Sequence, residues 1–524
     1  MNYYIGLDFG TTNSILSYFE QNEVKTYKFG SNNSGDQYIP SFIAYDEELG
    51  VAIGTAARTV ASETGVESYG NFKMQLPIPD SDLIDQATRH PVDITIDYLK
   101  ELLISENSTF SFNNQKGAIE GLVVSVPEIW VRDFRNLGRE RLKKILTEQL
   151  ELPLIQLISE PVAAASYYVW KAQKEKKLSF DPEKILLVCD VGGGTFDVSI
   201  CRIYGDKNIE VLAYFGKGER GLEDAGVAFD RRCVKIAYQK KHQQEIDDNS
   251  PEFYRLLNEF ESKKIGIHDR ATKRIINYLK EPETQKEKSV YSFSGYEVNC
   301  QEVEEAFAPI KNNIQGVMEE VNNWLQENNR QLDHVFFVGG FSQFILVKRA
   351  ITEALNIDSQ DQRIERVNLE TSAFAISYGA CLIAQGEIDP IEKYHHTLGI
   401  VVMNPNTYEE EDIPLIAGKN LPIKDLVNPF YSEQTVTGIN RELNGIKLWI
   451  DFQSRGNIKR ERLNEPIQLP DFSSSAKYQI GMRVDKSQIS YLVIKNVQTQ
   501  RKAEYELGNI LERMFPTGLI IDYC

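Results

Sequence analysis

The chain has 524 residues, of which 42% are hydrophobic and 26% charged, and its formal net charge is −18. This length exceeds one hydrophobic core, so we expect roughly two to four domains. The acidic balance argues against nucleic acid or an anionic membrane surface as the main partner. The six cysteines form no C-x-x-C pair, and no apolar run approaches the roughly 18 residues that cross a bilayer. We therefore expect a cytoplasmic protein with reduced cysteines.

Four short apolar runs, each ending in a turn signal, are typical of strands buried on both faces of a sheet. Helical patterns separate them. In one of these, residues 303–325, apolar side chains recur at every third or fourth position. Strands that alternate with helices predict an α/β architecture. The four runs are residues 3–7, 122–126, 185–189 and 335–338.

Two of these runs lead into similar loops, which form a loose internal repeat. The first loop begins at Asp8 and continues with a glycine and two threonines. The second begins at Asp190 and continues with three glycines and a threonine. Apolar residues after each loop could return as the partner strand of a hairpin. We therefore expect two similar halves, each presenting one loop to a shared cleft.

The loops have the composition of phosphate-binding turns. Glycine lets backbone N–H groups approach phosphate oxygens, and threonine adds a hydroxyl donor. Aspartates beside them would repel phosphate unless a cation lies between, so Asp8, Asp190 and Asp197 indicate Mg²⁺, held through water. A third glycine turn, at 339–342, could receive the adenosine end of a nucleotide. The sequence contains no P-loop motif, so we expect a different class of ATP site.

In this order and combination, the motifs resemble those of the seventy-kilodalton heat-shock chaperones, within the actin, sugar-kinase and chaperone superfamily. The resemblance extends over about residues 1–385. It implies a duplicated actin-like (ribonuclease H-like) ATPase domain that binds ATP or ADP with Mg²⁺ between two lobes. The motifs that carry it are residues 5–14, 126–127, 160–165, 190–197, 338–340 and 378–380.

The domain limits follow from the resemblance and from a change of pattern near residue 389. Alternating polar and apolar residues replace the helical patterns after that point, as at 446–452, 478–484 and 489–494. The predicted segments are an actin-like domain at 1–389 (lobe I about 1–187, lobe II about 188–389), cleft-wall insertions at about 39–114 and 223–304, a linker at 390–394 and a β-rich domain at 395–524.

The resemblance also implies roles for single residues. Lys73 would position the water that attacks the γ-phosphate, and Glu160 matches the active-site glutamate. Asp190, Thr195 and Asp197 complete the expected catalytic group, and Asp8, Asp190 and Asp197 would hold hydrated Mg²⁺. The expected nucleotide contacts are Gly10, Thr11, Thr12, Asn13, Gly192, Gly193, Gly194 and Thr195 at the phosphates, with Glu261, Lys264, Gly339, Gly340, Phe341, Ser342 and Gln343 at the adenosine end.

Two further matches and three departures concern regulation and affinity. Pro127 and Arg135 match a proline switch and the arginine that senses it. Where the chaperones sandwich the adenine between two arginines, this chain has Ile265 and Gln343, and Phe341 replaces a small residue. Each lost guanidinium removes about 0.5–2 kcal/mol of cation–π stacking. The sequence therefore predicts weakened or altered nucleotide affinity.

The C-terminal segment resembles the chaperones' β-sandwich, which binds extended peptides through backbone hydrogen bonds and an apolar pocket. The chain departs from the family where residues 390–394 replace a linker of consecutive leucines. We also expect no helical lid after the β-rich segment. Because of both departures, we do not expect tight trapping of a client or ordinary coupling between the domains.

Three functions are compatible with these features. The first is a slow, chaperone-like ATPase whose nucleotide state controls polypeptide binding by the β-domain. The second is a regulatory or scaffold ATPase with one dedicated protein partner, and the third is a small-molecule kinase of the same fold. The expected partners are an unfolded or extended polypeptide, or that dedicated protein, together with a co-chaperone or exchange factor.

Overall fold

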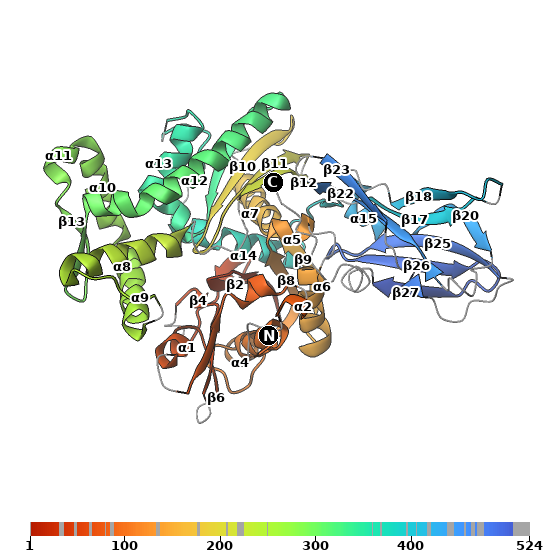
Figure 1. Cartoon of the computed structure of the whole chain (residues 1–524), viewed down its shortest axis with the longest axis horizontal. Coiled ribbons are helices and arrows are strands. Elements are labelled where there is room, and N and C mark those ends of the chain that lie inside the picture. The colour runs from red at the N-terminus through yellow and green to blue at the C-terminus, as the bar shows by residue number, and fades with distance from the viewer. Residues whose placement is uncertain are drawn as a thin grey trace.

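The computed structural model describes residues 2–506 apart from short gaps, and every structural statement refers to these residues. A mixed α/β part with two lobes carries a β-rich domain at one side (Figure 1). None of the described helices is long and apolar enough to cross a membrane. The gaps are 31–35, 47–49, 62–64, 79, 84–88, 133–136, 176–178, 206–207, 217–224, 249, 359, 367–368, 395–396, 405, 417–420, 438–444, 455–456, 463–466 and 469–475.

Lobe I contains a six-stranded sheet. Its strands are β1 (Asn2–Phe9), β2 (Asn13–Glu20), β3 (Glu23–Thr26), β4 (Ile39–Pro40), β8 (Ala118–Val126) and β9 (Leu154–Ser159). The order is β3-β2-β1-β8-β9, with β4 paired to β2. β1 runs antiparallel to β2 and parallel to β8. Both faces of β1 are covered, which explains the unbroken apolar run in the sequence.

Lobe II repeats this plan with a four-stranded sheet. Its strands are β10 (Lys184–Val191), β11 (Phe196–Tyr204), β12 (Asn208–Gly216) and β15 (His334–Val338). The order is β12-β11-β10-β15, with β10 antiparallel to β11 and parallel to β15. β10, β11 and β15 thus correspond to β1, β2 and β8. The hairpins expected after both loops, and the four predicted strands, are present.

Two helices join the lobes at close range. α7 (Glu160–Lys174) follows β9, and α14 (Leu369–Gln385) packs against both α7 and β1. A Cβ atom added to Gly379 of α14 would lie 1.7 Å from the carbonyl oxygen of Ala163. A Cβ atom on Gly6 of β1 would lie 2.2 Å from the backbone nitrogen of Cys381. Only glycine at these two positions permits the backbones to approach so closely.

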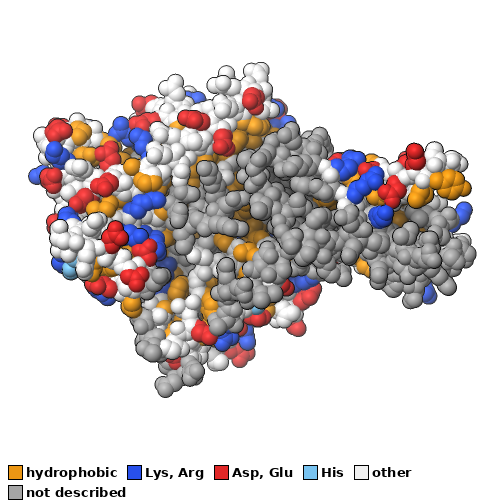
Figure 2. All heavy atoms as spheres, viewed as in Figure 1, with side chains coloured by type: hydrophobic (Ala, Val, Ile, Leu, Met, Phe, Trp, Pro, Cys, Tyr) orange, Lys and Arg blue, Asp and Glu red, His pale blue; other side chains and the backbone are white. Residues whose placement is uncertain are grey.

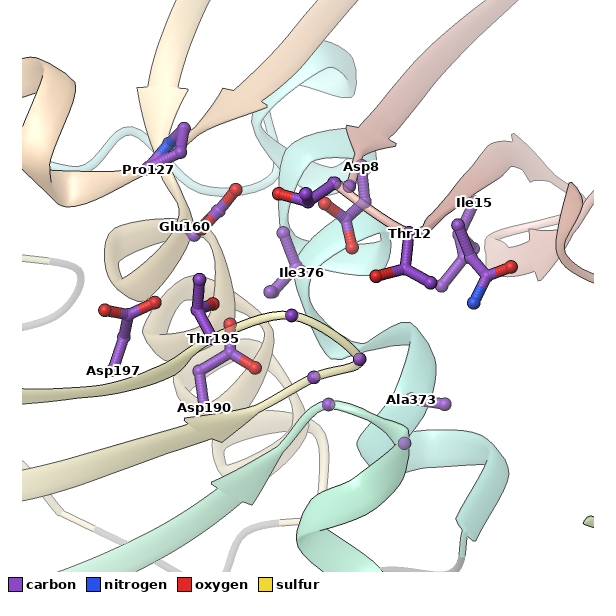
Figure 3. Close-up of a pocket in the computed structure, with 18 of the residues that line it drawn as sticks. Asp8, Thr12, Ile15, Pro127, Glu160, Asp190, Thr195, Asp197, Ala373 and Ile376 are labelled. Carbon is purple, nitrogen blue, oxygen red and sulfur yellow. The ribbon is translucent and has the colours of Figure 1, made fainter. Parts of the chain in front are cut away.

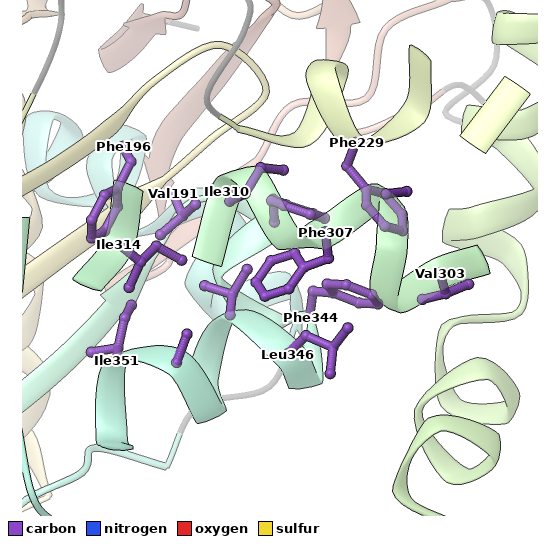
Figure 4. Close-up of a cluster of buried hydrophobic side chains, with 14 of the residues drawn as sticks. Val191, Phe196, Phe229, Val303, Phe307, Ile310, Ile314, Phe344, Leu346 and Ile351 are labelled. Carbon is purple, nitrogen blue, oxygen red and sulfur yellow. The ribbon is translucent and has the colours of Figure 1, made fainter. Parts of the chain in front are cut away.

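The largest buried cluster lies in lobe II around a long helix. α12 (Cys300–Glu327) begins with a capping box, in which Asn299 and Glu302 each accept a hydrogen bond from the other's backbone N–H. Its predicted apolar stripe is buried against α13 (Ile345–Ala354) and α8 (Gly226–His242). Figure 4 shows these side chains interdigitating. The stripe therefore belongs to the core.

Both predicted insertions contain regular elements that extend the lobes. The first holds β5 (Phe42–Asp46), β6 (Gly50–Ile53), α1 (Gly54–Val60), β7 (Glu67–Gly70), α2 (Asp80–Leu83), α3 (Pro91–Leu103) and α4 (Phe112–Gln115). The second holds α9 (Pro251–Gly266), α10 (His268–Lys280), α11 (Pro282–Gln285), β13 (Ser289–Phe293) and β14 (Tyr296–Asn299). An ion pair of 3.0 Å between Arg58 of α1 and Glu261 of α9 connects the two insertions.

The C-terminal domain is a pair of four-stranded antiparallel sheets around one apolar core. One sheet has the order β18 (Glu410–Ile416), β17 (Thr397–Met403), β22 (Leu448–Ser454), β23 (Asn457–Arg462). The other has the order β20 (Phe430–Thr437), β25 (Lys477–Val484), β26 (Ser490–Asn496), β27 (Lys502–Glu506). Within the segment predicted as linker, β16 (Lys393–Tyr394) pairs with β19 (Leu421–Pro422) and so joins this domain.

The β-domain rests against lobe I through buried polar contacts. Arg139 lies on α6 (Leu137–Lys144), is fully buried, and donates to the carbonyl oxygen of Ser487 at 2.7 Å. The Ser487 hydroxyl accepts from the backbone N–H of Leu157 at 3.0 Å. Lys143 contacts Asp485 at 2.6 Å, and Lys144 contacts Glu506 at 2.8 Å. The turn between β25 and β26 is therefore held by residues of lobe I.

Candidate functional site

A cleft of about 200 Å³ lies between the lobes, and the two loops form its floor (Figure 3). We call the region around both loops and their acids the phosphate end, and the region around Ile265 and the 339–340 turn the base end, after the ligand groups predicted there. The residues that line the whole cleft are Asp8, Gly10, Thr11, Thr12, Asn13, Ile15, Tyr38, Met74, Pro127, Ile129, Glu160, Asp190, Gly192, Gly193, Gly194, Thr195, Asp197, Tyr214, Ile265, Gly339, Gly340, Ala373 and Ile376.

The two loops nearly touch at the phosphate end. Each loop connects two antiparallel strands, β1 to β2 and β10 to β11. A Cβ atom on Gly193 would lie 2.6 Å from the Thr12 hydroxyl oxygen, so glycine is needed for this approach. The Thr12 hydroxyl and the Asn13 side-chain oxygen are buried and have no hydrogen-bond partner in the described structure. Such atoms are expected to meet a ligand or water.

Four carboxylates converge beside the loops, with one lysine among them. Asp8 is the penultimate residue of β1 and accepts a 2.9 Å hydrogen bond from Ser125. Lys73 lies on the short helix η2 (Phe72–Gln75), is 1% exposed, and pairs with Glu160 at 2.9 Å. Figure 3 shows Asp8, Glu160 and Asp190 around a common space. The structure thus brings the sequence-predicted catalytic lysine and glutamate into contact.

The one lysine among these carboxylates supplies too little positive charge to balance their negative charge. Burial, reinforced by Glu160 and opposed by Lys73, raises the pKa of Asp8 to about 7. Burial, followed by repulsion from Glu160, Asp197 and Asp8, raises the pKa of Asp190 well above its ordinary value. Burial also raises the pKa of Asp197 to about 6. A bound cation would reverse these shifts because it stabilises the ionised carboxylates.

The structure fits a hydrated Mg²⁺ better than a directly ligated metal. No group of three or more His, Cys, Asp or Glu side chains in the described part of the chain has the geometry to bind a metal ion. Asp8, Asp190 and Asp197 nonetheless line one cleft with the buried, unpartnered Thr12 hydroxyl. These residues would hold such an ion through its water molecules, and the ion would supply positive charge to the site.

Tyr214 is a residue of the site that the sequence analysis missed. It lies on β12, lines the cleft, and donates a 2.5 Å hydrogen bond to Asp197. Burial, followed by the charge of Asp197, raises the pKa of Tyr214 well above 10. Tyr214 lies 17 residues after Asp197, and no sequence motif links the two residues. Only the pairing of β12 with β11 could have indicated the contact.

The base end is sparse in polar side chains. Gly339, Gly340 and the half-exposed Ile265 line it, as does Tyr38. The side chain of Phe341 is buried away from the cleft. It packs against two aromatic residues of the lobe II core, Phe229 and Phe344.

The next two residues of the turn also face inward. Ser342 is buried and donates to the carbonyl oxygen of Gly339 at 2.7 Å. Gln343 is buried and accepts a 2.5 Å hydrogen bond from Lys348. The cleft lining includes neither residue nor Phe341. Any contact of this turn with a nucleotide therefore depends on the backbone of residues 339–340.

The expected adenosine-contacting helix supplies other contacts. Glu261 is paired across the cleft with Arg58, and Lys264 forms two 2.7 Å hydrogen bonds with the buried Asp230. Neither residue is among those that line the cleft. Pro127 does line the cleft, whereas Arg135 lies outside the described residues. The roles of all these residues in nucleotide binding stay predictions.

Sequence comparisons support the resemblance over the two lobes. The Hsp70 protein family matches residues 4–100 and 112–388. A chaperone protein DnaK from Thermotoga neapolitana is 26% identical over 360 residues, covering 67% of this chain and 54% of the relative. DnaK from Mycoplasma mobile is 27% identical over 275 residues, covering 52% and 41%. The chain therefore spans about half the length of the curated relatives that it matches.

Proposed function

The chain belongs to the Hsp70 family, and we propose that it binds Mg²⁺-ATP in the cleft, hydrolyses it slowly, and uses the nucleotide state to control polypeptide binding by its β-domain. The observation that carries this proposal is the phosphate end. Two glycine-threonine loops from equivalent hairpins meet there, beside a group of carboxylates. A single lysine, Lys73, lies among these carboxylates and pairs with Glu160.

The residues present can perform the positioning that phosphoryl transfer requires. The backbone N–H groups of the two loops would bind the β- and γ-phosphates, with the Thr12 and Thr195 hydroxyls as further donors. Lys73 is held by Glu160 at 2.9 Å and would orient the attacking water and stabilise charge on the γ-phosphate. Hydrated Mg²⁺, held by Asp8, Asp190 and Asp197, would neutralise charge on the phosphate oxygens.

The free end of the β-domain offers a surface for an extended polypeptide. Met403 at the end of β17, Tyr408 in the following connection and Phe430 at the start of β20 are 57%, 81% and 54% exposed. Figure 2 shows hydrophobic side chains at this end of the molecule. Exposed apolar side chains beside strand edges suit peptides that bind through backbone hydrogen bonds and apolar contacts.

Contact between the lobes and the β-domain provides a route for control. The turn between β25 and β26 contacts α6 and β9 of lobe I through Arg139 and Leu157. A nucleotide can shift the docking equilibrium only if it binds the docked and undocked forms with different affinity. We therefore propose that ATP and ADP differ in their preference for the docked form.

The proposal is tested by measuring the ATPase rate with and without an unfolded peptide, and peptide affinity in ATP and in ADP. We expect slow basal hydrolysis, stimulation by peptide, and different peptide affinities in the two nucleotides. The double substitution Tyr408→Ala with Phe430→Ala should weaken peptide binding. Tyr254→Ala, which removes an exposed aromatic residue of lobe II, should leave it unchanged.

Other outcomes would favour the alternative functions. Turnover that requires a small-molecule acceptor would indicate a kinase of the same fold. Absence of peptide stimulation, combined with one stable protein partner recovered in ATP or in ADP, would indicate a scaffold ATPase. Absence of nucleotide binding would overturn the proposal altogether.

We also propose that the protein is located in the cytoplasm. A further proposed partner is a co-chaperone or exchange factor.

A further inference from the structure

We propose that Tyr214 is a positioning residue of the ATPase centre, which fixes the Asp197 carboxylate through its hydroxyl group. This inference rests on the proposed function. The hydroxyl donates to Asp197 Oδ1 at 2.5 Å, and both residues line the cleft. Tyr214 touches a carboxylate predicted to hold the hydrated metal, so it acts on the centre through Asp197.

Strand pairing places the tyrosine in reach of this carboxylate. Asp197 on β11 lies opposite Gly216 on β12, and Ser199 lies opposite Tyr214. Asp197 and Tyr214 are therefore diagonal neighbours on one face of the sheet, a spacing that long aromatic side chains can bridge. Gly216 leaves this space open, because a Cβ atom there would lie 2.9 Å from Asp197 Oδ1.

The surroundings of the hydroxyl show why a donor is useful there. Glu128 and Glu160 both act electrostatically on Tyr214, in addition to Asp197. A cavity of about 10 Å³ adjoins these four residues and Asp190. Repulsion among the carboxylates would turn Asp197 away from its neighbours unless a donor holds it. The phenol supplies one donor to Asp197, and the hydroxyl of Thr195 supplies another.

A fixed Asp197 keeps its carboxylate in one orientation in the lining of the cleft. Hydrogen bonds to metal-associated carboxylates commonly orient them in this way. The substitution Tyr214→Phe removes the donor and keeps the ring, so packing between β11 and β12 is preserved. We expect it to lower kcat, and to weaken Mg²⁺-dependent ADP binding, by about 10- to 100-fold.

The experiment combines single-turnover hydrolysis with calorimetric titration of ADP over a series of Mg²⁺ concentrations. The matched control is Tyr168→Phe, because the Tyr168 hydroxyl is also buried but has no hydrogen-bond partner in the described structure. The control should behave as wild type in both measurements. Thermal melts of all variants establish that each one is folded.

A double-substitution cycle separates positioning from a general structural effect. If Tyr214 acts through Asp197, Tyr214→Phe should have no further effect in an Asp197→Ala background. Additive effects, or a wild-type Mg²⁺ dependence in Tyr214→Phe, would overturn the inference. A wild-type protein that binds ADP and Mg²⁺ without hydrolysing ATP would contradict the proposed hydrolysis, yet the calorimetric test of Tyr214 would still stand.

Discussion

The two ends of the cleft are built from different kinds of side chain. At the phosphate end, the buried Asp8 and the partly accessible Asp190 and Asp197 lie beside two glycine loops and a single lysine, Lys73. At the base end, the lining consists of Ile265, the 339–340 backbone and few polar groups. One end has acidic groups that a cation would neutralise and loop donors that an anion would accept from, whereas the other has few polar groups that could distinguish one base from another.

This contrast indicates where binding energy originates. Clustered acids without matched charges repel one another, and a bound Mg²⁺-phosphate group would relieve this unfavourable electrostatic energy. The base end offers apolar contact and lacks the stacking that a guanidinium supplies. Affinity should therefore depend mainly on the phosphate groups.

Removing the buried lysine should have the largest effect. Lys73→Met leaves Glu160 and the aspartates without their cation, so kcat should fall about 100- to 1,000-fold and the free energy of unfolding of the nucleotide-free protein by about 3–5 kcal/mol. Single-turnover hydrolysis and thermal melts measure both. The control Lys171→Met removes a surface ion pair with Glu365 and should cost less than about 1 kcal/mol. Equal effects of the two substitutions would contradict this account of the phosphate end.

Two adjacent glycines provide a matched pair at the loops. A Cβ atom on Gly193 would collide with Thr12, whereas one on Gly192 meets no atom within 4 Å. Gly193→Ala should therefore separate the loops and weaken ATP binding by about 1–3 kcal/mol, while Gly192→Ala should bind nearly as wild type. Calorimetric titration of ATP compares them. Similar losses in both variants would show that the contact with Thr12 is unimportant.

At the base end, a guanidinium should improve binding. Ile265 is 41% exposed and lines the cleft, so an arginine has room there. Ile265→Arg should tighten ATP binding by about 0.5–2 kcal/mol through stacking, and Ile265→Gln should not. Unchanged affinity in the arginine variant would mean that the base does not lie against this position.

The smallest expected effect concerns acidic groups between the phosphate end and the β-domain, and their influence on docking of the β-domain against lobe I. Glu128 acts electrostatically on Tyr214, on Arg139 and on Glu392. Its buried carboxyl group thus lies between the phosphate end and the interface.

Although part of Glu392 is accessible to solvent, burial of its carboxyl group raises its pKa to about 7. The docked state therefore retains a proton between about pH 4.5 and 7 that the undocked state releases. Docking should weaken by about 1 kcal/mol from pH 6 to pH 8 and change little above that range. Small-angle X-ray scattering measures docking at each pH, and Glu392→Gln should reduce the dependence. An undiminished slope in this variant would assign the effect to another group, such as Glu140, whose pKa is also raised to about 7 by burial and by its contact with Glu506 of the β-domain.

The sequence predicted the parts of the site whose signal is local. The runs before Asp8 and Asp190 are apolar throughout because both faces of β1 and β10 are buried. The loops that follow have glycines and threonines at positions where the backbone would approach a bound phosphate. The duplicated hairpins could therefore be inferred from the amino-acid sequence alone.

Other parts depend on geometry that residue order does not encode. The contact of Tyr214 with Asp197 requires the register of β12 on β11, which is shifted by an irregularity between Ile200 and Cys201. The inward direction of Phe341 and Gln343 depends on the conformation of the turn after Gly339, whose φ is +82°. Family resemblance placed those two side chains in the cleft, but packing in lobe II draws them away.

The burial of Arg139 also has a consequence for how the protein is made. Its partner Ser487 lies 348 positions further along the chain, which a ribosome needs roughly 20–70 s to synthesise. During that interval a newly made lobe I must keep Arg139, Lys143 and Lys144 in water, because their partners in the β-domain do not yet exist. The nascent chain thus carries a temporary basic surface, which disappears only when the last strands are complete.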